Sequence, residues 1–207
     1  MTQDKQPEYT RVRLVQSLRT PFGKSDIGVG VILKGEGSLF LPPCGKKGPY
    51  ALALQMRVRC GDIVPINENF YRIVDVQAAP SPGGFGASRG HVTIDSTPIS
   101  LEGIQLRPDA LAVPLGAEVE IAAYDKAGHA LHGYTLEVLD INTSTATLDI
   151  WPVEHAKPCT EPELIQSHCV KAGDKLSLSP CTLSILSVVP SNPQRGLRGF
   201  VKISLSP

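Results

Sequence analysis

Large apolar residues and polar residues alternate in short runs along much of the chain, and turn-forming residues separate the runs. The alternation is strictest over Tyr50–Cys60, where Tyr, Leu, Leu, Met, Val and Cys occupy every second position. A two-residue period places successive side chains on opposite faces of a β-strand. Further strands are expected at 29–33, 38–41, 134–139 and 145–151. The pattern therefore predicts an all-β protein.

Two local sequence signals predict where strands end and where a short helix forms. Pro42 and Pro152 are expected to end the strands that precede them, because proline cannot donate a ladder hydrogen bond. The segment Thr160-Glu161-Pro162-Glu163 has the pattern of a capping box with proline in the first turn, which predicts a short helix over Glu161–Val170. That helix occupies the place in the second half that the Tyr50–Cys60 strand has in the first, so one of the two assignments should be wrong.

The second half of the chain repeats the apolar pattern of the first. The repeated segments are 61–66 and 173–178, 71–76 and 183–188, and 89–94 and 198–203. Self-similarity at about half the chain length indicates two copies of one domain. We therefore expect two tandem homologous small β-barrel or β-sandwich domains at 10–99 and 111–207, joined by a linker at 100–110. Val12–Val15 and Val119–Ala122 are expected to be their corresponding first strands.

Composition and charge exclude some classes of function. The 19 Gly and 18 Pro residues favour turns over long helices. The formal net charge is zero, without the positive field expected of a nucleic-acid binder. Residues 1–105 carry 12 Lys and Arg against 9 Asp and Glu, and residues 106–207 carry 8 against 11, so the halves differ in sign. No apolar run reaches the roughly 20 residues of a membrane span, and Met1–Glu8 does not resemble a signal peptide. We expect a cytoplasmic protein that binds neither nucleic acid nor membranes.

Cysteine and histidine residues give little support to a metal site. The cysteines are Cys44, Cys60, Cys159, Cys169 and Cys181, an odd number at positions that the repeats do not share, so reduced thiols are expected. The second half holds His129, His132, His155 and His168. His129 and His132 fall on a predicted hairpin, where residues three apart point to opposite faces. We expect neither a metal nor another cofactor.

Catalytic signatures are weak. Cys44 lies next to Lys46 and Lys47, which could lower the pKa of its thiol. A cysteine nucleophile also needs a nearby base, and the sequence nominates none, so an ordinary loop thiol is the preferred interpretation. No catalytic residue is assigned. The alternative is an enzyme whose site lies between the halves and uses the histidines of the second half.

The closing hairpin of each half is the best candidate for a binding site. These hairpins are expected to expose Phe85 and Arg89 in the first half, and Arg195, Leu197 and Arg198 in the second. Aromatic and arginine side chains are common hot spots of protein interfaces. Arg89 and Arg198 recur in both halves, which equally suits two similar bracing roles.

The edge at Trp151 and the acidic strand 118–121 are the next places to look for a binding site. The sequence as a whole is most consistent with a non-enzymatic protein-binding module. We expect an inhibitor or adaptor, of the kind represented by immunity proteins that neutralise toxins, with another protein as its partner. A structural or assembly subunit is a further alternative.

Overall fold

The computed structural model describes residues 11–23, 25–41, 50–80, 89–107, 109–124, 130–153, 165–179 and 181–206. Within these ranges the regular structure is antiparallel β-strand, apart from a short 3-10 helix, η1 (Pro193–Arg195). The all-β prediction is confirmed.

The first half contains β1 (Arg11–Val15), β2 (Arg19–Phe22), β3 (Ser25–Leu33), β4 (Glu36–Leu41), β5 (Tyr50–Arg59), β6 (Ile63–Ile66), β7 (Asn69–Gln77) and β8 (His91–Asp95). The second contains β9 (Leu111–Pro114), β10 (Glu118–Tyr124), β11 (Ala130–Ile141), β12 (Thr145–Val153), β13 (Gln166–Lys171), β14 (Lys175–Leu178), β15 (Cys181–Val189) and β16 (Phe200–Ser206).

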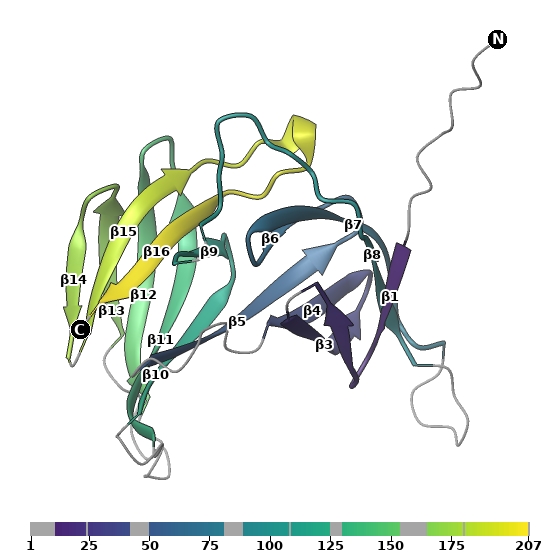
Figure 1. Ribbon diagram of the computed structural model, residues 1–207, viewed down its shortest axis with the longest axis horizontal. Coiled ribbons are helices and arrows are strands. Elements are labelled where there is room, and N and C mark those ends of the chain that lie inside the picture. The colour runs from purple at the N-terminus through teal and green to yellow at the C-terminus, as the bar shows by residue number, and fades with distance from the viewer. Residues whose placement is uncertain are drawn as a thin grey trace.

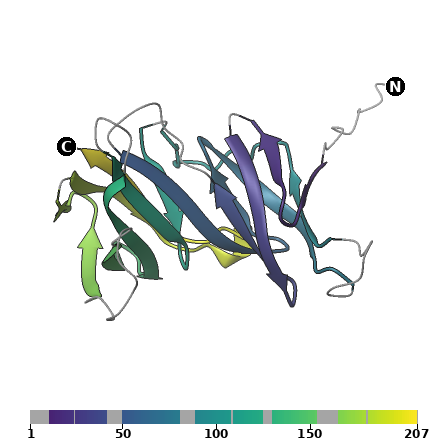
Figure 2. The ribbon, with the colours of Figure 1, turned by 90° about the horizontal axis from the view of Figure 1, so that it is seen from below.

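The strands form three sheets. An eight-stranded sheet has the order β13-β12-β11-β10-β5-β4-β3-β2, so it takes four strands from each half and joins them where β5 pairs with β10. Each half adds one four-stranded sheet, β1-β8-β7-β6 or β14-β15-β16-β9. In Figure 1 most strands of the first half lie to the right and those of the second half lie to the left, and Figure 2 shows the molecule turned by 90°.

The same local structures occur in both halves. Gly61-Asp62 and Gly173-Asp174 form turns in which the glycine φ angles are 92° and 93°. The aspartate accepts a hydrogen bond from the amide three residues before it, at 3.0 Å for Asp62 and 2.9 Å for Asp174. Glycine suits both turns because it adopts a positive φ without steric cost. Each turn leads into a hairpin, β6–β7 or β14–β15, that forms one edge of a four-stranded sheet.

The predicted correspondence between Val12–Val15 and Val119–Ala122 is wrong. The first segment lies in β1, which pairs with β8, whereas Val119–Ala122 lies in β10 of the eight-stranded sheet. The strand that occupies the place of β1 in the second half is β9, which pairs with β16. Residues 111–114 contain no charged residue, so alternation of apolar and charged positions could not reveal this strand.

Two further expectations are wrong, because the residues concerned pair with neighbouring strands. Residues 166–170, assigned to a helix by the capping box, lie in β13, and Gln166–Lys171 pairs along β12; residues 161–164 lie outside the described ranges. Pro152 does not end its strand, because it pairs with Tyr134 and β12 continues to Val153. Pro42 lies outside the described residues. The strand predicted at Tyr50–Cys60 is confirmed as β5.

The hydrophobic core continues through both halves. Its main cluster takes buried residues from strands of all three sheets, from Leu14 in β1 to Ile203 in β16. A second cluster joins the halves and consists of Ile63, Phe70, Leu101, Ala112, Leu197 and Phe200. The connecting segment follows this cluster closely, since the amide of Ile99 donates a 2.8 Å hydrogen bond to the carbonyl of Phe70.

Candidate binding surface

The closing loop of the second half packs on the first half. The amide of Ile63 donates a 2.9 Å hydrogen bond to the carbonyl of Gly196. Arg198 Nη2 lies 2.7 Å from Asp62 Oδ2, and its Nη1 donates to the carbonyl of Arg57. The Arg198 side chain is only 19% exposed. This loop therefore braces the two halves together.

The predicted hairpin residues have different environments. Leu197 is 5% exposed and belongs to the second cluster, so the prediction that it is an exposed tip is wrong. Arg195 and Arg89 are exposed, and Trp151 is half-buried. Phe85 lies outside the described residues. A sequence pattern cannot show that a loop folds back on the other half, which is why Leu197 was assigned to an exposed tip.

The two recurring arginines are expected to contribute unequally to stability. Arg198→Ala removes a charge-assisted pair and leaves the carboxylate of Asp62 half-buried, so we expect the free energy of unfolding to fall by about 1–2 kcal/mol. Arg89→Ala changes an exposed side chain and should cost less than about 0.5 kcal/mol. Urea denaturation of both variants measures the difference, and equal losses would contradict the brace.

One face of the eight-stranded sheet carries a row of residues that are in register across every strand. We call it the outer row. It consists of Arg19, Gly28, Phe40, Gln55, Glu118, Glu137, Asp149 and Ser167, each paired with the next. The neighbours of these residues along the strands, such as Leu39, Leu54 and Val119, are buried on the opposite face. The outer row thus crosses both halves on the side of the sheet away from the core.

The first-half part of this face exposes two large apolar side chains. Phe40 is 41% exposed and Leu33 is 68% exposed. The Phe40 ring lies over Gly30, where an added Cβ would come within 2.6 Å of the ring carbon Cε2. Glycine at this position therefore lets the aromatic ring pack against the backbone of the neighbouring strand while it remains partly exposed.

The second-half end of the outer row is acidic. Glu137 is directly opposite Glu118 on one side and Asp149 on the other. Burial raises the pKa of the Glu137 carboxyl, and the charges of Glu118 and Asp149 raise it further, while Arg57 lowers it. Ser167 donates a hydrogen bond to Asp149. Like charges that face each other across strands are destabilising, so this arrangement costs the fold stability.

Glu137→Gln is expected to stabilise the protein at neutral pH. Because the folded-state pKa lies above the ordinary value of 4.5, the unfolded chain ionises first and stability falls as pH rises through that window. The variant lacks this loss and should gain about 0.5–1 kcal/mol at pH 7. The gain should vanish below about pH 4, where the carboxyl is protonated in both states. Urea denaturation at several pH values measures it, and a gain that persists in acid would rule out charge as the cause.

His91 forms a separate polar cluster. Its Nδ1 accepts a 3.0 Å hydrogen bond from Arg13 Nη2, and its Nε2 lies 3.6 Å from Asp75 Oδ2. The side chain is buried and links β1, β7 and β8. It occupies the place that Phe200 holds in the second half, since both residues begin the strand after an Arg-Gly pair. These contacts support a structural role.

The remaining candidate chemistry is only partly described. His129, His155, Cys44 and Cys159 lie outside the described residues, the side chain of His132 is also not described, and His168 is half-buried on β13. In the described part of the chain no three His, Cys, Asp or Glu side chains gather as metal ligands do. Cys60, Cys169 and Cys181 are free. Burial raises the pKa of the Cys181 thiol, which keeps it in the unreactive protonated form.

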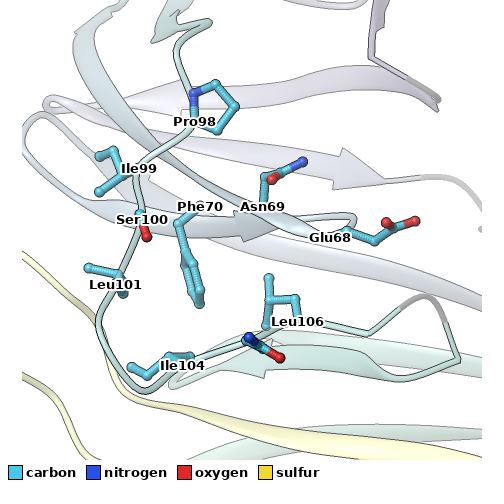
Figure 3. A pocket seen from close by; sticks show the side chains of 10 residues that line it. Glu68, Asn69, Phe70, Pro98, Ile99, Ser100, Leu101, Ile104 and Leu106 are labelled. Atoms are coloured by element: carbon cyan, nitrogen blue, oxygen red, sulfur yellow. The ribbon is translucent and has the colours of Figure 1, made fainter.

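A pocket of about 290 Å³ lies where the connecting segment passes the β6–β7 hairpin. Figure 3 shows the ring of Phe70 pointing toward Ile104 and Leu106, with Glu68 and Asn69 at the rim. The apolar lining is continuous with the second cluster that joins the halves. The pocket is therefore part of the junction.

Across the described ranges, the structure contains no helix with the length and apolar character to cross a membrane. Comparisons with protein-family models, with curated proteins and with solved structures found no match to this chain.

Proposed function

We propose that the chain is a protein-binding module that uses the outer face of its eight-stranded sheet. The observation that carries this proposal is the outer row, which runs from an exposed aromatic residue on β4 to three carboxylates on β10–β12. Large apolar side chains exposed together mark interaction sites, and functional surfaces commonly cost stability. The half-buried Trp151 lies on the same face, opposite Thr135, so one predicted binding residue remains part of the proposed surface.

The proposed module consists of two tandem copies of one β domain that acts as a cytoplasmic inhibitor or adaptor, such as an immunity protein. The repeated Gly-Asp turns and the matching order of the four-stranded sheets support the two-copy organisation. The free thiols of Cys60, Cys169 and Cys181 are compatible with a reducing compartment. In this proposal the second closing loop stabilises the junction and leaves the sheet face available for the partner.

A comparison of two charge-reversed proteins tests the binding surface. The variant Glu118→Lys/Glu137→Lys changes the outer row, and Glu102→Lys makes the same kind of change in the exposed connecting segment. Both are checked for folding by thermal denaturation and used with the wild type to capture proteins from cells that express the chain. We expect a partner captured by the wild type and by Glu102→Lys to be lost from the double variant.

Each captured protein is then purified and its affinity for the three forms is measured by calorimetry. A loss of at least about 100-fold for the double variant, equivalent to about 2.7 kcal/mol, supports the proposed surface. Equal affinity of every captured partner for all three forms would show that the outer face is not the binding surface.

A further inference from the structure

We propose that the outer row docks a basic amphipathic helix of the partner protein, laid across the strands from β4 to β12. One apolar side chain of the helix would contact Phe40, and lysine or arginine side chains would contact Glu118, Glu137 and Asp149. This inference rests on the proposed function, because it names the chemistry of the partner that the same face receives.

The spacing of the carboxylates favours a helix over an extended strand. Glu118, Glu137 and Asp149 lie on adjacent strands in register, so they follow one another at steps of about 4.8 Å. Side chains three or four residues apart on a helix are separated by about 5–6 Å. Alternate side chains of a strand are separated by about 6.6 Å, which loses register with the three carboxylates.

The distance between Phe40 and Glu118 also matches the spacing of side chains on a helix. Two strand steps separate it from Glu118, with Gln55 between them, which is a distance of about 10 Å. Two turns of a helix cover about 10.8 Å. A helix with an apolar residue at one position and basic residues 7, 11 and 14 positions later therefore presents all four side chains on one face at nearly the required spacing.

The negative charge of the outer row favours a positively charged partner. Glu137 has a carboxylate opposite it on both sides, so a positively charged occupant replaces repulsion by attraction. Complementary charge of this kind fixes the register of docking and speeds association. Val31 and Leu33 are also exposed, on the neighbouring strand β3.

The test uses an 18-residue helical peptide with leucine at position 2, lysines at positions 9, 13 and 16, and alanine or glutamine elsewhere. A control peptide has the same composition with lysines at positions 7, 11 and 14, which lie on the opposite face from the leucine. Trp151 is the single tryptophan of the chain. It lies two residues after Asp149 on β12, and it belongs to the row next to the outer row, in which Thr135 pairs with both Trp151 and Glu120. Its fluorescence reports binding.

We expect a saturable change in Trp151 emission with the first peptide and at least tenfold weaker binding of the control peptide. Glu118→Gln/Glu137→Gln should weaken the first peptide at least tenfold, whereas Glu102→Gln should leave its affinity within twofold. Circular dichroism confirms that the variants are folded. Equal affinity for the two peptides, or an unchanged affinity of the double variant, would overturn the helix proposal.

The capture experiment separates this result from the proposed function. If a natural partner is lost from Glu118→Lys/Glu137→Lys but the first peptide does not bind, the outer face binds a protein and the partner element is not a basic helix. If neither result is obtained, both the surface and the partner chemistry are wrong.

Discussion

Phe200→Ala is expected to lower the free energy of unfolding by about 3–5 kcal/mol, the largest loss expected for a single side chain in this protein. Phe200 is fully buried, and its ring lies 5.6 Å from that of Phe70 at a tilt of 49°. It stands where β16 meets the second cluster, so its truncation leaves a cavity between the halves. Urea denaturation followed by circular dichroism measures the loss.

Phe40→Ala is the matched control, because it removes the same side chain from a partly exposed position on the sheet face. It should cost less than about 1 kcal/mol, since large effects of truncation come from cavities in the core. A loss for Phe200→Ala as small as that of the control would mean that the second cluster does not hold the halves together.

Gly196→Ala is expected to cost about 2–4 kcal/mol. The residue has a φ of 72°, and an added Cβ would lie 2.7 Å from the carbonyl oxygen of Gly61. Left-handed backbone geometry by itself costs an alanine about 1–2 kcal/mol. The clash with backbone adds to this because the loop must move away from the first half, which weakens the hydrogen bond to Ile63. The unfolding midpoint in urea reports the combined loss.

Gly116→Ala isolates the backbone part of that effect. Its φ is 71°, and nothing lies within 4 Å of an added Cβ. The variant should therefore cost only about 1–2 kcal/mol. If the two glycine variants were equally unstable, close approach of the closing loop to Gly61 would not contribute to stability.

The local sequence pattern predicts a strand correctly where the strand itself alternates apolar and polar residues. It fails where pairing with a neighbouring strand decides the structure. Tyr50–Cys60 alternates strictly, and β5 follows. In 166–170 the local capping signal favours a helix, but these residues pair along β12 and extend the sheet beyond it. Local preference is readily overridden when an adjacent strand offers backbone hydrogen bonds. The repeat of the Tyr50–Cys60 position was the better guide to this segment.

The candidate site was less accessible to sequence reasoning. The acidic strand at 118–121 was visible from its alternation, but its meeting with Glu137 and Asp149 depends on register. That register includes an irregularity between Val138 and Asp140, which no local pattern specifies. The position of Arg198 against Asp62 likewise depends on how one half packs on the other. The arginine repeat indicated a bracing role without showing which residues of the first half Arg198 contacts.

The pairing of β5 with β10 joins the last sheet strand of one half to the first sheet strand of the next. A joint of this head-to-tail kind can in principle be repeated indefinitely and produce a fibre. In the second half Lys175 occupies the place of Ile63, and Thr182 that of Phe70, so the apolar residues that contact the closing loop are not repeated there. Pro21 in the terminal strand β2 cannot donate a hydrogen bond to an incoming strand. The proline and these polar residues therefore disfavour repetition of the same joint at these places.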